Sequence, residues 1–175
     1  FDDARMAISL ALTADKEGAN LLNYMEVTGV EKDNNMLKGV RVKNQLDGSE
    51  TAVKAKVIIN ATGVFSDNVI RMDQPDAKPM IRPSQGVHLV IDKSFLQENY
   101  AIMVPHTTDG RVLFAVPWNG QVVVGTTDTP VDEALEEPRP LEQEIDFILE
   151  NASAYMTKKP YCKDVKSIFA GLRPL

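Results

Sequence analysis

The chain has 175 residues, 43% of them hydrophobic, so it can bury a core without disulfides to stabilise it. Its formal net charge is -6, and its basic residues are scattered. Pairs such as Lys158-Lys159 are too short to form the basic surface of a nucleic-acid-binding protein, so nucleic acid is not an expected partner. No run approaches the ~20 apolar residues of a membrane-spanning helix, and the single cysteine, Cys162, excludes an intramolecular disulfide and fits a reducing compartment.

The first part of the chain predicts one helix and three strands. Asp2 or Asp3 can cap a helix whose apolar residues recur at helical spacing, and Gly18 stands where a helix C-terminus favours a left-handed residue. Alternating apolar residues and turn signals then predict a β-meander with strands over residues 21–30, 36–43 and 51–59.

The last of these strands opens into small and polar residues, Asn60-Ala61-Thr62-Gly63. An apolar strand that leads through a small-residue turn toward a helix often places backbone N–H groups against a nucleotide. Such sites usually carry a G-x-G-x-x-G turn after their first strand, but no two glycines of this chain lie two residues apart. The pattern therefore predicts the second half of a dinucleotide site without the first.

Both ends of the chain suggest where the first half belongs. The chain opens on Phe1, already at a predicted helix start, and stops at Leu175, in or just after a predicted strand. We expect both ends to lie inside a longer polypeptide, whose upstream part would carry the G-x-G-x-x-G turn.

Beyond a proline-containing linker predicted at residues 71–84, the pattern is mostly β. A helix is expected to begin near Pro140, a residue favoured in the first turn. We therefore predict an α+β fold in two domains, with a helix and a β-meander in residues 1–72 and a mostly antiparallel sheet with a covering helix in residues 73–175. The strands of that sheet are expected over residues 86–91, 100–105, 111–118, 121–127 and 165–173.

Two histidines are available for chemistry. His106 lies beside a predicted turn and is interpreted as solvated surface. His88 lies within an apolar strand, on the face opposite Val87, Leu89 and Ile91. It is either a core histidine bonded to a backbone carbonyl or a donor or general base that lines a substrate cavity, and the residues alone leave both open.

Arg173 poses the same question on the last strand. Period-two counting places it on one face with Val165, Ser167, Phe169 and Gly171. A guanidinium there can bind a carboxylate or phosphate through two N–H groups, or it can be a surface arginine at a strand end.

Two further observations concern a hydroxyl-rich segment and metal ligands. The hydroxyl-rich segment Gly125-Thr126-Thr127-Asp128 is interpreted as a turn. No cluster of residues has the spacing of metal ligands, so we expect no metal.

Six segments in order carry a resemblance to a known family. They are Phe1-Asp2-Asp3-Ala4-Arg5, Val57-Ile58-Ile59-Asn60-Ala61-Thr62-Gly63, Gln85-Gly86-Val87-His88-Leu89-Val90, Val116-Pro117-Trp118, Gly125-Thr126-Thr127-Asp128 and Gly171-Leu172-Arg173-Pro174-Leu175. Together they resemble the FAD-dependent glycerol-3-phosphate dehydrogenases, the bacterial aerobic, quinone-linked enzymes of the glycine- and D-amino-acid-oxidase-like flavoproteins. The resemblance covers essentially the whole chain. Its N-A-T-G element is shared with many flavoproteins, whereas the pairing of G-T-T-D with G-L-R-P-L is much narrower.

The resemblance implies a role for each domain. Residues 1–72 would be part of an FAD-binding lobe, and residues 73–175 would form a substrate-binding lobe whose sheet covers the flavin ring. Ala61, Thr62 and Gly63 would let the backbone approach FAD, because bulkier side chains would hold the cofactor off.

The resemblance also implies a reaction, the oxidation of sn-glycerol 3-phosphate to dihydroxyacetone phosphate with hydride transfer to FAD and electrons passed to quinone. His88 matches a family histidine at the substrate site and would be the base or orient the substrate hydroxyl. Arg173 matches an arginine that contacts the substrate, and it would bind and polarise it. Gln85 stands where some members of the family have lysine. The uncharged glutamine would weaken a positive contact near the substrate phosphate.

Two alternatives stay open at this point. The protein would be a related flavin oxidase, acting on glycerol 3-phosphate or on another hydroxy acid or amine with oxygen as acceptor, or it would be a non-catalytic domain of the same fold. This chain alone is expected to be inactive and to lack tightly bound FAD, because the phosphate-binding turn is absent. The implied location is cytoplasmic, with any peripheral contact to the inner face of the membrane made by other parts of the protein.

Overall fold

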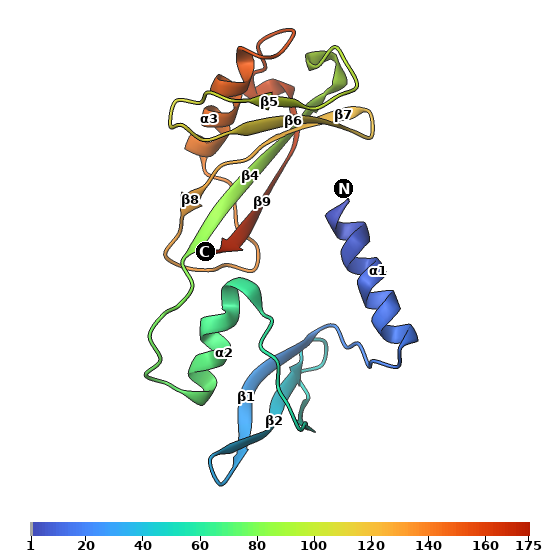
Figure 1. Cartoon of the computed structure of the whole chain (residues 1–175), viewed down its shortest axis with the longest axis vertical. Coiled ribbons are helices and arrows are strands. Elements are labelled where there is room, and N and C mark those ends of the chain that lie inside the picture. The colour runs from blue at the N-terminus through green and yellow to red at the C-terminus, as the bar shows by residue number, and fades with distance from the viewer. Residues whose placement is uncertain (1) are drawn as a thin grey trace. The chain divides into compact units, whose positions relative to one another are not determined.

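The computed structural model describes residues 2–175, so Phe1, which begins one of the six resembling segments, lies outside the described residues. The contacts between elements define two compact units (Figure 1). One comprises the described residues up to Asn60 with Asn68–Asp76, and the other comprises Ala61–Asp67 with Ala77–Leu175. The predicted assignment of residues 1–72 to an FAD-binding lobe and of residues 73–175 to a substrate-binding lobe stays a prediction.

The first unit begins with the predicted helix, α1 (Asp3–Lys16). The Asp2 carboxylate caps this helix by accepting the backbone N–H of Arg5 at 2.9 Å, which satisfies one of the free donors of the first turn. Gly18 follows the helix with φ +92°, the left-handed backbone that glycine adopts without strain. Both the cap and the stop signal predicted for this helix are therefore confirmed.

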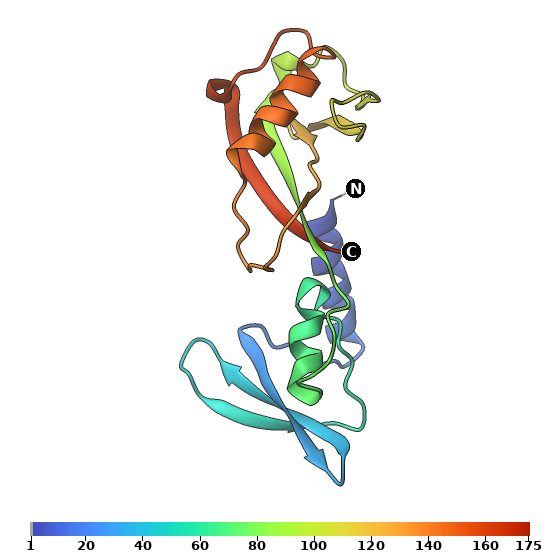
Figure 2. The same ribbon diagram turned by 90° about the vertical axis from the view of Figure 1, so that its left-hand side faces the viewer.

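A three-stranded antiparallel meander follows, as expected, in the order β1-β2-β3 (Figure 2). Its strands are β1 (Met25–Asp33), β2 (Met36–Asn44) and β3 (Glu50–Lys54). The expected strand over residues 51–59 was wrong in its second half. The pairing of β2 with β3 ends at Gly39 and Lys54, and beyond it Val57 and Ile59 are exposed and pair with no strand among residues 2–175. A β-branched run needs a neighbouring strand to complete its hydrogen bonds, and within the described residues none reaches this one.

The turn at residues 60–63 does lead into a helix, as its small residues indicated. A short 3-10 turn, η1 (Gly63–Phe65), runs directly into α2 (Ser66–Asp73). The buried Asp67 carboxylate accepts the backbone N–H of Met80 at 3.0 Å and that of Ile81 at 3.2 Å. These bonds tie the start of the helix to the linker that precedes the second sheet.

The second unit is built on six antiparallel strands. They are β4 (Pro83–Asp92), β5 (Ile102–Val104), β6 (Leu113–Trp118), β7 (Gln121–Gly125), β8 (Thr129–Pro130) and β9 (Val165–Pro174). The central strand β4 pairs with β7 and then β8 along one edge and with β9 along the other, and β6 and β5 extend the sheet beyond β7 (Figures 1 and 2). Short 3-10 turns, η2 (Lys93–Phe95) and η3 (Cys162–Asp164), follow β4 and precede β9.

One face of this sheet forms the core of the unit beneath α3 (Glu142–Ser153). The inward residues of β4 are Val87, Leu89 and Ile91, all fully buried, and they belong to one apolar cluster with Ile148 and Ala152 of the helix. The expected covering helix and the alternation of β4 are thus confirmed. Since α3 covers only this face, the residues between the buried ones point to the opposite, open face.

Candidate functional site

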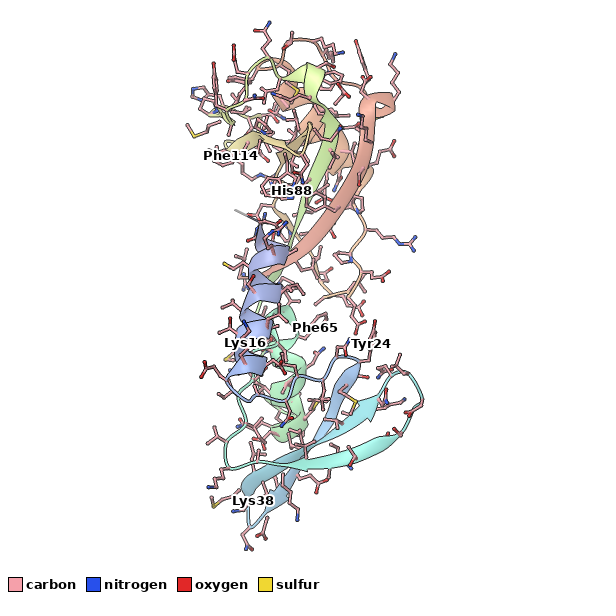
Figure 3. All side chains as sticks on the ribbon, turned by 90° about the vertical axis from the view of Figure 1, so that its right-hand side faces the viewer. Lys16, Tyr24, Lys38, Phe65, His88 and Phe114 are labelled. Atoms are coloured by element: carbon pink, nitrogen blue, oxygen red, sulfur yellow. The ribbon has the colours of Figure 1, made fainter. Side chains whose placement is uncertain are left out.

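His88 lies in a row of side chains across the open face of the second unit's sheet (Figure 3). The pairing register places it beside Gly125 of β7, places Gly125 beside Phe114 of β6, and places Phe169 of β9 on the other side of His88. The rings of His88 and Phe169 stack with centroids 4.9 Å apart and planes 10° from parallel. Phe114 and Phe169 are 47% and 48% exposed, so this face presents uncovered aromatic surface around the imidazole.

The imidazole lies close to the sheet because Gly125 has no side chain. A Cβ built on Gly125 would lie 2.4 Å from Cδ2 of His88, so any larger residue would push the ring outward. No hydrogen bond joins His88 to another residue within the described part of the chain. The core histidine bonded to a carbonyl, one of the two alternatives, is therefore not what the structure contains.

Arg173 reaches the same face from β9. Ser84 is its partner on β4, and the next pair on this face is Gly171 with Gly86. The guanidinium crosses over Gly86, where a built Cβ would lie only 2.4 Å from Nη2 of Arg173. A glycine at this point of β4 is what allows the side chain to turn toward His88.

The segment between β7 and β8, residues 126–128, holds the guanidinium. Arg173 Nη2 donates to the Thr126 hydroxyl at 3.0 Å, and Nη1 donates to the Thr127 carbonyl at 3.2 Å. Nη1 also lies 3.4 Å from Oδ1 of Asp128, which accepts a further hydrogen bond from the Ser84 hydroxyl. Arg173 is thus held by three residues and is not a free surface arginine, and the hydroxyl-rich segment interpreted as a turn is a scaffold for it.

The charge of Arg173 acts on His88. Burial lowers the pKa of the imidazole below its usual value of 6.5, and the nearby positive guanidinium lowers that pKa further. The ring is therefore neutral at neutral pH, and a neutral imidazole can accept a proton. The two residues singled out on separate strands share one face, where one can attract an anion and the other can act as a base.

Period-two counting predicts that four residues of β9 share a face with Arg173. The prediction is confirmed for Ser167, Phe169 and Gly171, but it is wrong for Val165. A β-bulge changes the register, because Val90 pairs with Ser167 whereas its neighbour Ile91 pairs with Val165. The extra residue of β9 reverses the alternation, so Val165 packs against the buried core.

Gln85 does not lie where the resemblance suggested. Its side chain is buried under α3, where Nε2 donates to Oε2 of Glu144 at 2.7 Å and to the Arg139 carbonyl at 3.0 Å. Because it alternates with Gly86 and His88, it points away from the open face. A lysine at this position would therefore meet a buried carboxylate, and Gln85 is no argument against a phosphate-bearing ligand.

The residues predicted to contact FAD also fall in the second unit. Ala61, Thr62 and Gly63 are exposed, Gly63 has φ +57°, and a Cβ built on it would meet nothing within 4 Å. The 3-10 turn that begins at Gly63 contacts β9, the strand that carries Arg173. Small side chains and an open glycine at the start of a helix fit the close approach of a phosphate-bearing cofactor. The contact with FAD itself stays a prediction.

Among the described residues no group of histidine, cysteine, aspartate and glutamate side chains has the arrangement of a metal site. His106 is exposed, as interpreted from its position beside a turn. The open face of the second unit, together with residues 61–63, is therefore the candidate functional site.

Comparison with known proteins identifies the family of the chain. Residues 1–175 match the family model described as DAO, FAD dependent oxidoreductase. The chain is 41% identical over 182 residues to the mitochondrial glycerol-3-phosphate dehydrogenase of Mus musculus, covering 99% of this chain and 25% of that protein. It is 42% identical over 177 residues to the mitochondrial glycerol-3-phosphate dehydrogenase of Arabidopsis thaliana, covering 100% and 28% respectively.

A solved structure extends the likeness to the fold. The glycerol-3-phosphate dehydrogenase from Bacillus halodurans, complexed with FAD, matches with a TM-score of 0.93 and 36% identity, covering 99% of this chain and 35% of that one. The resemblance found in the six segments is thus confirmed across the chain, which spans about a quarter of the length of the curated relatives. The chain belongs to the family of FAD-dependent oxidoreductases.

Proposed function

We propose that this chain forms the substrate-facing sheet, and part of the FAD site, of a dehydrogenase that oxidises sn-glycerol 3-phosphate to dihydroxyacetone phosphate. The observation that carries the proposal is that the His88 imidazole shares one open face with the Arg173 guanidinium, which segment 126–128 holds in place. The names of the relatives at 41% and 42% identity support the choice of substrate.

The two side chains divide the work on the substrate. Arg173 binds the anionic substrate, through its phosphate or through the carbonyl oxygen that develops at C2, and segment 126–128 keeps the guanidinium in place. His88 accepts the proton of the C2 hydroxyl, since its pKa is lowered and its ring is neutral. FAD, when bound, supplies the acceptor for the hydride from C2. Ala61, Thr62 and Gly63 let the backbone approach that cofactor.

Quinone is the proposed electron acceptor, as in the enzymes that the sequence resembles. No helix among residues 2–175 is long and apolar enough to cross a membrane. A cytoplasmic location, with peripheral contact to the inner face of the membrane through other parts of the protein, stays a prediction.

Anaerobic reduction of the flavin tests the proposal. In the full-length protein, sn-glycerol 3-phosphate is expected to bleach the flavin absorbance near ~450 nm, because the substrate transfers its hydride to the cofactor. Glycerol, which lacks the phosphate that Arg173 would bind, is the matched control and should bleach it far more slowly. A soluble quinone should then reoxidise the flavin faster than oxygen does.

Three outcomes separate the alternatives. Faster reoxidation by oxygen would replace the dehydrogenase by an oxidase. Reduction by another hydroxy acid or an amine, with none by glycerol 3-phosphate, would overturn the substrate. A full-length protein without bound flavin would favour the non-catalytic domain.

A further inference from the structure

A buried carboxylate lies on the opposite side of the sheet from His88, in a position that the proposed reaction does not use. Glu144, in the first turn of α3, is only 3% exposed. Each of its two oxygens accepts two hydrogen bonds, and the four donors come from four separate places in the second unit. Burying a charged group costs free energy, and hydrogen bonds such as these four offset that cost.

The four donors are arranged in two pairs. Oε2 accepts the Gln85 amide of β4 at 2.7 Å and the backbone N–H of Leu141 at 2.8 Å, which caps α3. Oε1 accepts the Thr127 hydroxyl at 3.0 Å and the Thr129 hydroxyl of β8 at 2.6 Å. Burial raises the pKa of Glu144, but these four hydrogen bonds together outweigh burial and leave the pKa below its usual value. The Glu144 carboxylate is therefore ionised, and it holds its four hydrogen-bond donors in place.

Thr127 links this carboxylate to the candidate site. It is 1% exposed, and its hydroxyl oxygen also accepts the backbone N–H of Val87 at 3.0 Å. That hydroxyl takes the place of a strand partner, since β7 pairs with β4 from His88 onward and β8 pairs with β4 only at Ser84 and Gln85. The carbonyl of the same residue holds Nη1 of Arg173. One residue thus joins the buried carboxylate on one side of the sheet to the guanidinium on the other.

We propose that Thr127 and Glu144 are positioning residues for the substrate site. The Glu144 carboxylate fixes the Thr127 hydroxyl, the hydroxyl fixes the path of segment 126–128 along β4, and that segment aims the Arg173 guanidinium at the anionic substrate. Neither residue touches the substrate. The inference rests on the proposed function, because it gives Arg173 a substrate to bind.

The test compares two threonines that bond the same carboxylate oxygen. In the full-length enzyme, Thr127→Val is expected to raise the KM for sn-glycerol 3-phosphate roughly tenfold, since the guanidinium loses its fixed position. Thr129→Val removes the other hydroxyl from Oε1, but the Thr129 side chain has no hydrogen bond to Thr127 or to Arg173. It should lower the melting temperature while changing KM less than twofold. Thr127→Ser restores the hydroxyl and should return KM to within about threefold of the wild-type value.

A purely structural role makes a different prediction. If Thr127→Val and Thr129→Val lowered the melting temperature and left KM equally unchanged, the positioning role would be overturned. Where Thr127→Val fails to accumulate, Glu144→Gln, which keeps the shape but presents an amide to donors, should raise KM in the same direction, and an unchanged KM would overturn the role. Absence of flavin reduction in the wild-type protein would instead overturn the proposed function, and this inference with it.

Discussion

Replacing Arg173 by methionine in the full-length enzyme is expected to raise the KM for sn-glycerol 3-phosphate at least tenfold. The guanidinium is already oriented by the Thr126 hydroxyl and the Thr127 carbonyl, so little side-chain freedom would be lost on binding an anion. A hydrogen bond to a charged group contributes about 1.5–3 kcal/mol, and each 1.4 kcal/mol is about tenfold in affinity. Steady-state kinetics with glycerol 3-phosphate measures the effect.

Two matched variants show whether the effect belongs to this arginine. Arg173→Lys keeps the charge but loses the planar fork, and it should recover only part of the loss. Arg41→Met removes an exposed arginine of β2 and should leave KM unchanged. A KM for Arg173→Met that equals that of Arg41→Met would remove Arg173 from the substrate site.

Gly86 offers a second route to the same defect. In Gly86→Ala the new Cβ would lie 2.4 Å from Nη2 of Arg173 and 2.7 Å from the Thr126 hydroxyl, so the guanidinium must move. The KM should rise in the direction seen for Arg173→Met. Gly171→Ala, at the directly opposite position of β9, meets nothing within 4 Å and is the control.

Replacing His88 by alanine is expected to reduce the rate of flavin reduction at least tenfold. General base catalysis by a positioned side chain contributes about 10²–10⁴ in rate, and His88 is the one histidine on the open face. Stopped-flow measurement under anaerobic conditions isolates this step from reoxidation by the acceptor. His106→Ala is the control, because that histidine is exposed beside a turn. Equal rates in the two variants would exclude His88 as the base.

The loss of activity at acidic pH is a second test of His88 as the base. The base must be neutral, and both burial and the Arg173 charge lower the pKa of His88 below 6.5. Activity should therefore persist as the pH falls past 6.5 and be lost only as the pH passes through the lowered pKa. Removing the positive charge in Arg173→Met should move that midpoint upward, toward 6.5, in the residual activity. A midpoint at or above 6.5 in the wild-type enzyme would contradict the assignment.

Local patterns were sufficient where a single strand or helix decides the outcome. The alternation of Val87, Leu89 and Ile91 predicted which face of β4 is buried, and so placed His88 on the other face. The same alternation places Gln85 on the buried face, because it lies two residues before Val87. A resemblance in residue order along the chain carries no information on strand face, so it does not place this side chain.

Tertiary contacts account for what the sequence left undetermined. The strand expected to reach residue 59 ends at Lys54, because a β-branched run becomes a strand only where another strand pairs with it. The bulge near Val165 depends on the register between β9 and β4, which are joined by some of the most distant contacts in the chain. The grip of segment 126–128 on Arg173 spans more than 40 residues and has no local signature.

His88 and Arg173 are proposed to act on one bound substrate. The most direct measurement is a crystal structure of the full-length enzyme with FAD and the product, dihydroxyacetone phosphate. We expect one ligand molecule to lie within hydrogen-bonding distance of both the imidazole of His88 and the guanidinium of Arg173. A ligand that binds elsewhere, or that contacts neither side chain, would contradict it.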